Sequence, residues 1–184
     1  MRQLFLFMMV SIDGYFETGP NGLDWHNVDE EFNAFAHEQD STVDTILFGR
    51  KTYEMMVRFW PTPEAENVDP ETATFMNETQ KIVVSHAPFT AEWNNTTVIS
   101  KNIVNQVKKL KDQPGNDIAI LGSNELCVTL MEAGMVDEFR IMVNPIALGK
   151  GNSLFTGLTE KVKLKLLWTR DFASGNILLC YAPV

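Results

Sequence analysis

Residues suited to binding a phosphate stand at three places where a short apolar run passes into helix-like sequence. Residues 49–52 combine a glycine that permits a tight turn with two adjacent cations and a hydroxyl, and residues 85–86 offer a hydroxyl and a titratable nitrogen. Residues 122–126 begin with small and polar side chains, which let a pyrophosphate approach backbone N–H groups at a helix start. Solvated surface charges and ordinary turn residues would give the same pattern, and that alternative stays open. The candidate binding residues are Gly49, Arg50, Lys51, Thr52, Ser85, His86, Gly122, Ser123, Asn124, Glu125 and Leu126.

Carboxylates and aromatic rings supply candidates for the reacting end of such a site. Asp13 follows the first apolar run and could move a proton, although an Asp-Gly turn explains it as well. Glu30 belongs to an acidic run at 29–31, where ordinary helix-start charges are an equal explanation. Trp25 and Trp60 could wall an aromatic substrate, and core or lid packing is the alternative for at least one of them.

The composition excludes several classes of protein. With 15 Lys and Arg against 24 Asp and Glu, the formal net charge of −9 argues against a general binder of nucleic acid or anionic membrane. The histidines and the two cysteines lack metal-ligand spacing, so no metal is expected, and no apolar run is long enough to span a membrane. Cys127 and Cys180 lie in apolar runs, which predicts buried free thiols and a cytoplasmic protein.

The elements that must position these residues alternate between apolar runs and helix-like segments. This order predicts one α/β domain over residues 1–184, with a mostly parallel twisted central sheet flanked by helices and an antiparallel C-terminal hairpin. Residues 60–70, with three prolines, are expected to be a loop. The expected strands are 4–10, 45–48, 81–85, 97–99, 117–122, 139–143, 163–168 and 176–181.

Taken in order, five blocks of the chain resemble the dihydrofolate reductase-like superfamily. The most similar branch is the stand-alone proteins that resemble the C-terminal reductase domain of riboflavin biosynthesis. The resemblance extends beyond residue 150 and is more specific for the fold than for the substrate. The blocks are VSIDGY (10–15), TILFGRKTYE (45–54), IVVS (82–85), ILGSNEL (120–126) and EAGMVDEF (132–139), which continues into PIALGKG (145–151).

The resemblance implies that NADPH lies across the strand ends. Residues 49–52 would then hold the adenosine phosphate end, with Arg50 and Thr52 as the main contacts. Ser85 and His86 would flank the 2′-phosphate, and 122–126 would border the pyrophosphate. A homodimer is plausible for this branch, and the C-terminal hairpin offers an apolar edge.

Three functions are compatible with these features. The first is an NADPH-dependent oxidoreductase that transfers a hydride to a small heteroaromatic or imine-like substrate, of pterin or pyrimidine type. The second is the 5-amino-6-(5-phosphoribosylamino)uracil reductase step of riboflavin biosynthesis, which would need a partner enzyme because the zinc-deaminase signature is missing. The third is a protein that binds NADPH without turnover.

Overall fold

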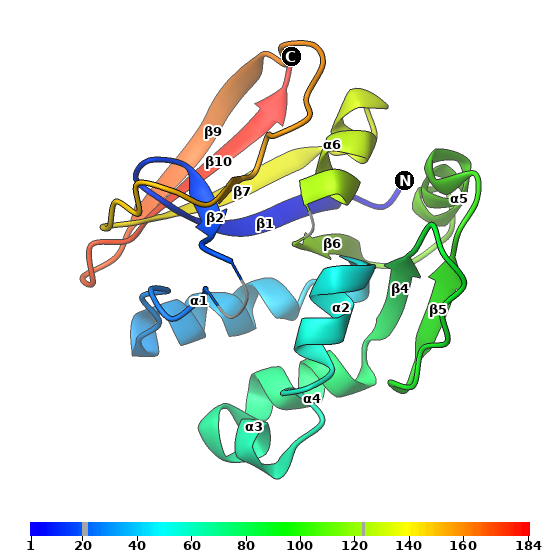
Figure 1. Ribbon diagram of the computed structural model, residues 1–184, viewed down its shortest axis with the longest axis horizontal. Coiled ribbons are helices and arrows are strands. Elements are labelled where there is room, and N and C mark those ends of the chain that lie inside the picture. The colour runs from blue at the N-terminus through cyan, green and yellow to red at the C-terminus, as the bar shows by residue number, and fades with distance from the viewer. Residues whose placement is uncertain (20–21, 123) are drawn as a thin grey trace.

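The computed structural model describes residues 1–19, 22–122 and 124–184, and its main feature is an eight-stranded twisted sheet (Figure 1). The strands are β1 (Leu4–Ser11), β3 (Val43–Gly49), β4 (Gln80–Val84), β5 (Thr96–Ile99), β6 (Asp117–Leu121), β7 (Glu138–Asn144), β9 (Leu164–Asp171) and β10 (Ile177–Pro183). Their order is β5-β4-β3-β6-β1-β7-β10-β9. The first six strands in this order run parallel, and β10 runs antiparallel to both β7 and β9. The predicted fold class is therefore confirmed.

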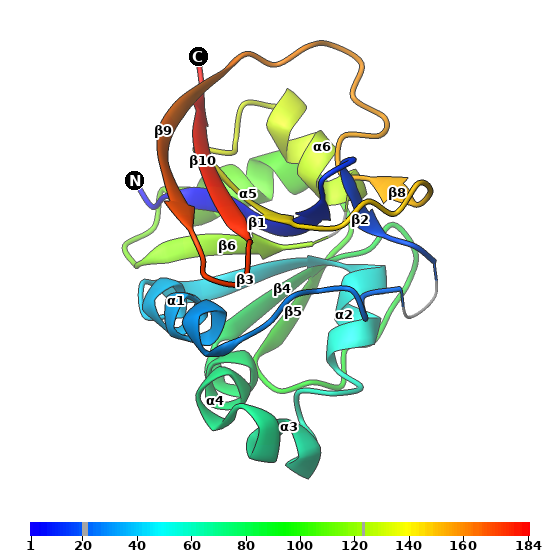
Figure 2. The ribbon, with the colours of Figure 1, turned by 90° about the vertical axis from the view of Figure 1, so that its left-hand side faces the viewer.

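Helices cover both faces of this sheet (Figure 2). On one face lie α1 (Glu30–Asp40), α2 (Arg50–Met56), α3 (Pro63–Val68) and α4 (Pro70–Glu78), and on the other lie α5 (Ile103–Lys111) and α6 (Asn124–Glu132). Short strands β2 (Tyr15–Glu17) and β8 (Asn152–Ser153) pair antiparallel in a separate small sheet. Among the described residues, none of the helices is long and apolar enough to cross a membrane.

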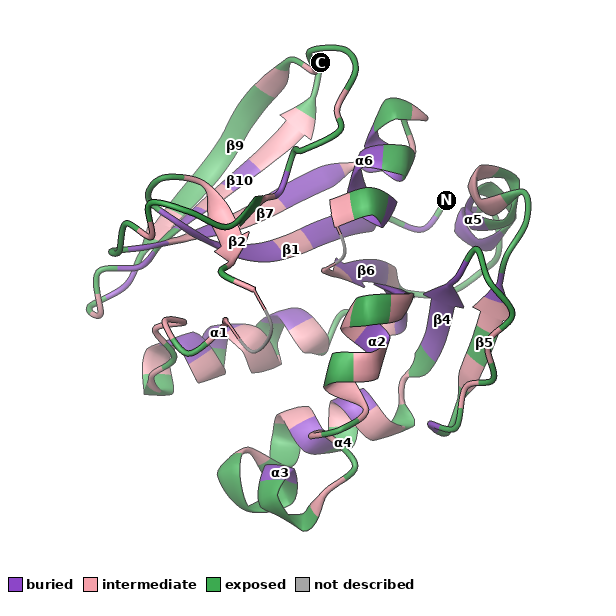
Figure 3. Ribbon diagram, viewed as in Figure 1, coloured by how far each residue is buried: buried purple, intermediate pink, exposed green. Residues whose placement is uncertain are grey.

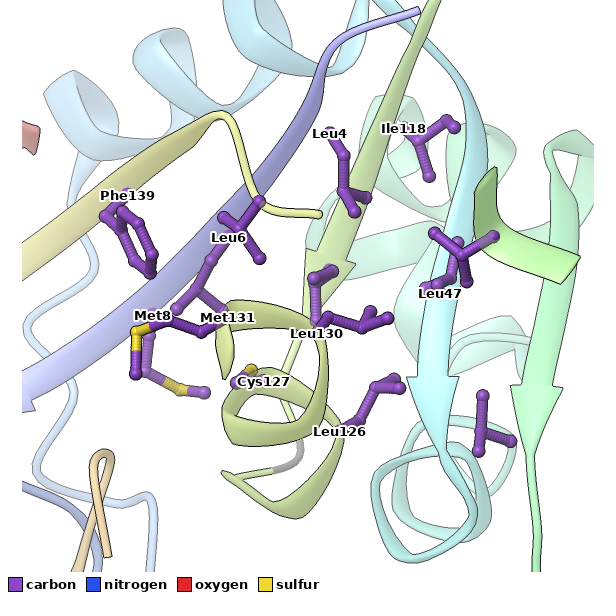
Figure 4. Close-up of a cluster of buried hydrophobic side chains, with 14 of the residues drawn as sticks. Leu4, Leu6, Met8, Leu47, Ile118, Leu126, Cys127, Leu130, Met131 and Phe139 are labelled. Atoms are coloured by element: carbon purple, nitrogen blue, oxygen red, sulfur yellow. The ribbon is translucent and has the colours of Figure 1, made fainter. Parts of the chain in front are cut away.

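Strand β1 explains how one continuous apolar run serves two cores. Leu4, Leu6 and Met8 pack with α5 and α6, where Leu126 and Leu130 belong to the same cluster (Figure 4). The residues between them point to the opposite face, where Phe5 packs with α2 and α4 and Met9 packs with α1. Because successive side chains of a strand alternate between the faces, a central strand covered on both sides must be apolar throughout.

The expectation of a loop at 60–70 is wrong, because α3 occupies most of it. Pro63 is the first residue of α3, and the Thr62 hydroxyl accepts a hydrogen bond from the Ala65 N–H (3.3 Å). Pro70 begins α4 in the same way, with the Asp69 carboxylate accepting from the Thr72 N–H (3.0 Å). The first residues of a helix have no intrahelical acceptor for their N–H groups, so proline there starts a helix instead of breaking one.

The two cysteines lie in the apolar interior, as predicted. Cys127 on α6 and Cys180 on β10 are free and buried. Burial raises the pKa of the Cys180 thiol to about 12 and raises that of Cys127 further, so both stay protonated at neutral pH. They act as small apolar side chains of the core.

Candidate functional site

The first and third anion-suited segments meet at the carboxyl ends of β3 and β6. Gly122, directly after β6, has a φ of +86° and lies against Thr52 in the first turns of α2. A Cβ at Gly122 would stand 3.2 Å from the Thr52 Cγ2 and 3.4 Å from its Oγ1. Only a glycine permits this backbone angle and this close approach without strain. Residues 70 positions apart in sequence therefore form one surface at the edge of the sheet where ligands of parallel α/β folds bind.

Arg50 is the first residue of α2 and brings a positive charge to this surface. Its Nε donates to the Glu54 Oε1 (2.7 Å), and its guanidinium carbon lies 5.0 Å from the centroid of the Phe89 ring. These contacts hold the guanidinium in one orientation, while 42% of the side chain stays exposed. Among the described residues, no partner binds its Nη groups. Arg50 therefore keeps two donor groups for a phosphate, with Lys51 exposed beside it.

The second segment lies at the end of β4, and its His86 side chain contacts Glu125 of α6. Ser85 is buried, and its hydroxyl donates to the carbonyl oxygen of Ala87 (2.8 Å), so its proton is already used within the loop. His86 is exposed, and its Nε2 lies 3.3 Å from the Glu125 Oε1. A small cavity of about 30 Å³ opens beside this pair. It is lined by Val84, His86, Ile103, Glu125, Leu126 and Thr129.

Asn124 at the start of α6 holds a loop that the sequence did not associate with it. Its Nδ2 donates to the carbonyl oxygens of Ser153 (3.2 Å), Leu154 (2.6 Å) and Thr156 (3.0 Å). The side chain is thereby committed to the 153–156 segment. Ser123, its neighbour in the predicted cofactor site, lies outside the described residues.

Asp13 ties together two loops at the end of β1. Its carboxylate accepts hydrogen bonds from the Ser11 hydroxyl (2.6 Å) and from the N–H groups of Leu148 (3.0 Å) and Gly149 (2.7 Å). These donors, the Ser11 hydroxyl foremost, lower the pKa of Asp13 to about 2. Asp13 is therefore ionised at neutral pH, and its contacts suit a positioning role better than proton donation.

The acidic run before and in α1 separates into three different environments. The Asp29 carboxylate accepts from the Phe32 N–H (2.8 Å) and caps α1, and the Glu31 Oε2 accepts from the Ala173 N–H (2.8 Å) in the C-terminal hairpin. Glu30 is exposed at the first helical position and has no hydrogen-bond partner among the described residues. Of these three carboxylates, only that of Glu30 accepts no hydrogen bond from a described residue.

The two candidate ring walls, Trp25 and Trp60, make separate contacts. Trp25 is partly buried, and its Nε1 donates to the Gly22 carbonyl oxygen (2.7 Å). Its ring lies edge-on to the His26 ring, with the two ring centroids 4.5 Å apart. Trp60 follows α2 and packs edge-on against the Phe59 ring, with the two ring centroids 5.1 Å apart. The described contacts do not bring the two indoles together, so a shared aromatic wall stays a prediction.

An asparagine network, which the sequence analysis missed, fixes the segment that carries Trp25. The Asn27 N–H donates to the Oδ1 of the fully buried Asn144 (2.9 Å), and its Nδ2 donates to the Ser174 carbonyl oxygen (2.9 Å). The Asn176 Nδ2 donates to the Asn27 carbonyl oxygen (2.7 Å). The network joins residues almost 150 positions apart, and separate asparagines in turn-like sequence give no signal of such contacts.

His26, the residue before Asn27, is buried. This burial lowers the pKa of the His26 imidazole to about 4, so the ring is neutral at neutral pH.

Among the described residues, no group of three or more His, Cys, Asp or Glu side chains is arranged to hold a metal ion.

The chain matches a known protein family over nearly its whole length. Residues 2–178 match the family model of the RibD C-terminal domain. The uncharacterized protein YyaP of Bacillus subtilis (strain 168) is 34% identical over 183 residues, covering 98% of this chain and 94% of that protein.

Two solved structures share the fold. A putative riboflavin biosynthesis protein from Shewanella sp. PV-4 gives a TM-score of 0.75 at 21% identity, with 99% of each chain covered. A dihydrofolate reductase from Enterococcus faecalis, complexed with NADP(H) and RAB-propyl, gives a TM-score of 0.66 at 17% identity, covering 98% of this chain and 96% of that one. At these identities the likeness establishes the fold alone.

Proposed function

Starting from the fact that this chain belongs to the RibD C-terminal domain family, we propose that it is an NADPH-dependent reductase of small molecules. The observation that carries the proposal is the contact of Gly122 with Thr52, which joins two anion-suited segments beside the exposed guanidinium of Arg50. The fold shared with a dihydrofolate reductase that binds NADP(H) gives independent support. The substrate class that we propose is a heteroaromatic ring or imine of pterin or pyrimidine type.

The residues of the surface fit the chemistry of the cofactor. Arg50, with Lys51 beside it, would pair with the phosphate on the adenosine ribose that NADPH has and NADH lacks. Gly49 and Gly122 leave room for a ligand to approach the backbone. Thr52, His86 and Asn124 border the same region, although Asn124 would act through the loop that it holds. When bound, NADPH would supply the hydride.

The proton that completes a reduction needs a separate source. Asp13 is held as a carboxylate by three donors and would keep its two loops in position. Glu30 has no partner among the described residues and is the stronger candidate of the two for contact with a substrate or a proton-carrying water. Trp25 and Trp60 remain the proposed rings beside the substrate.

The first experiment measures NADPH and NADH binding by titration calorimetry. Wild-type protein should bind NADPH more tightly than NADH, and Arg50→Ala should weaken NADPH binding by about tenfold or more while changing NADH binding little. Glu54→Gln removes the negative charge beside Arg50 but keeps an acceptor oxygen and the cation, so it should retain the preference for NADPH. Arg58→Ala, an exposed cation just after α2, is the matched charge control. Equal affinity of wild-type protein for both cofactors would contradict the proposal.

A turnover assay separates the alternatives. Oxidation of NADPH in the presence of pterins, pyrimidines or quinones supports a reductase, and activity restricted to the phosphoribosylaminouracil substrate would assign the riboflavin step. The name of the Shewanella structure motivates that second candidate. Tight NADPH binding without oxidation by any of these compounds would favour a protein that binds the cofactor without catalysis.

A further inference from the structure

The connection between β4 and β5 packs on the face of the sheet that α2 covers. Adjacent parallel strands are usually joined by a helix, yet residues 85–95 form bends, turns and irregular backbone throughout. Phe89 and the buried Trp93 of this connection belong to the apolar cluster that also holds Tyr53 of α2. Figure 3 shows exposed as well as buried residues on α2, which therefore presents one side to the core and another to solvent.

Trp93 anchors the β4–β5 connection in the core. Its backbone N–H donates to the Tyr53 hydroxyl (2.9 Å), and its Nε1 donates to the Oδ1 of Asn77 on α4 (2.7 Å). The Nζ of Lys81 on β4 lies 4.7 Å from the centroid of its ring. Tyr53 and Trp93 are both buried, so this part of the connection is fixed by contacts with α2, α4 and β4.

Phe89 lies between this anchor and the exposed side of α2. Its ring meets the Tyr53 ring edge-on, with the two centroids 5.3 Å apart, and the Arg50 guanidinium carbon lies 5.0 Å from its centroid. Residues three positions apart lie on the same face of a helix, so one ring can contact both Arg50 and Tyr53. Pro88 restricts the backbone directly before Phe89. The ring is therefore held by the core and meets a cation at the surface.

An aromatic ring holds a cation in a way that suits the binding of an anion. The electron-rich face of the ring attracts a guanidinium without neutralising its charge. Glu54 accepts from the Nε of Arg50, and the Nη groups stay available as donors. A side chain that is fixed before the ligand arrives loses less conformational entropy on binding. These conditions favour the binding of a phosphate by Arg50.

We propose that Phe89 is a positioning residue for Arg50, and that the preference for NADPH over NADH depends on its aromatic ring. This inference rests on the proposed function, in which Arg50 pairs with the ribose phosphate that only NADPH has. Because NADH has no phosphate at that position, loss of the ring weakens the binding of NADPH alone. The β4–β5 connection thus contributes to the choice of cofactor through a side chain that does not contact it.

Titration calorimetry with both cofactors tests the role of the ring. Phe89→Leu keeps an apolar side chain against Tyr53, and it should weaken NADPH binding by about fivefold while changing NADH binding by less than about twofold. Phe89→Tyr keeps an aromatic ring and should retain the preference for NADPH. Phe75→Leu on α4 removes a half-buried ring from the same cluster and should change neither affinity. A loss of packing alone would weaken the binding of both cofactors.

A double-variant cycle tests whether Phe89 acts through Arg50. In the Arg50→Ala background the guanidinium is absent, so adding Phe89→Leu should lower NADPH affinity further by less than about twofold. A loss of about fivefold that persists in this background, or an equal loss for NADH, would mean that Phe89 acts on the cofactor or the fold directly. Either result would overturn the proposal.

Side-chain NMR of Arg50 adds a measurement without cofactor. The Nε–H resonance of Arg50 should move in Phe89→Leu, because the ring current is lost, and should stay close to its wild-type position in Phe89→Tyr. An unmoved resonance in Phe89→Leu would overturn the proposal. Equal affinity of wild-type protein for NADPH and NADH would overturn both this proposal and the proposed function, whereas a preference for NADPH that Phe89→Leu retains would overturn this proposal alone.

Discussion

Single residues in this protein take roles that their type alone does not reveal. Asp13 has the chemistry of a proton donor, yet three hydrogen-bond donors lower its pKa to about 2 and make it the link between two loops. Ser85 looks like a phosphate ligand, yet its hydroxyl proton is used by Ala87. Arg50 is held by Glu54 and still exposes donors. Gly122 matters because it has no side chain.

Gly122→Ala should damage both the fold and the cofactor surface. An alanine at a φ of +86° costs about 1 kcal/mol, and its Cβ would also crowd Thr52 at 3.2 Å. We expect a lower free energy of unfolding in urea and, on the proposed function, NADPH binding weakened by about tenfold.

Two controls separate strain from crowding. Gly134 has a φ of +65°, and no atom lies within 4 Å of an added Cβ. Gly134→Ala should therefore lower the free energy of unfolding through backbone strain without weakening NADPH binding. Adding Thr52→Ser to Gly122→Ala removes the Cγ2 and should recover part of the stability. Unchanged stability of Gly122→Ala would contradict the close approach of Gly122 to Thr52.

At the scale of elements, the junction of α1 with α4 concentrates charged groups. His37 of α1 places its Nε2 3.1 Å from Asp69, the residue that caps α4, and its Nδ1 3.2 Å from Glu71. Asp40 ends α1 beside them, and burial raises the pKa of its carboxyl from 3.8 to about 7, with Asp69 and Glu71 adding to the effect and His37 opposing it. The folded protein therefore retains a proton here that the unfolded chain releases.

Asp40→Asn should change how stability depends on pH. Because the folded state binds the extra proton between pH 3.8 and about 7, the wild-type free energy of unfolding should fall as pH rises through this range. An asparagine cannot ionise, so the variant should lack this loss and exceed wild type at pH 8 by on the order of 2 kcal/mol.

Thermal unfolding at pH 5 and pH 8 gives the comparison. Asp112→Asn, an exposed change at the end of α5, should follow the wild-type dependence on pH. If the stability of wild type and of Asp40→Asn changed equally between pH 5 and pH 8, the pKa of Asp40 would not be raised in the folded protein.

At the scale of the whole molecule, the C-terminal hairpin has one buried and one exposed role. Leu178 of β10 is fully buried in a cluster with Met9, Phe32 and Phe35, which ties the hairpin to β1 and α1. The outer strand β9 is exposed and is the last strand of the sheet. The same hairpin therefore closes the core on its inner side and ends the sheet on its outer side.

Leu178→Ala should destabilise the entire domain. Removing a fully buried leucine side chain leaves a cavity in this cluster and should cost about 2–5 kcal/mol, measured by urea unfolding at one protein concentration. Val68→Ala removes an apolar side chain that is 69% exposed and should change stability by less than about 0.5 kcal/mol. A loss of similar size in both variants would contradict the role given to the hairpin.

Most of the fold could be predicted because its signals are local. The apolar run at β1, the turn glycines and the order of strands and helices predicted the parallel sheet and the C-terminal hairpin, and the structure confirms both. The wrong prediction at 60–70 has a local cause as well. Proline breaks a helix when it lies in the interior but favours a helix when it is the first residue, as Pro63 is in α3. The single domain and the roles of the site residues stay predictions.

Composition and periodicity by themselves determined which residues face the core and which segments could receive an anion, because burial and backbone freedom follow from residue type. Only the tertiary structure decided which of these groups are free to act. It brought Gly122 to Thr52, tied the Asn124 amide to 153–156 and exposed the edge of β9. Hydrogen-bond partners come from distant parts of the chain, and the packing of the whole sheet determines which of them meet.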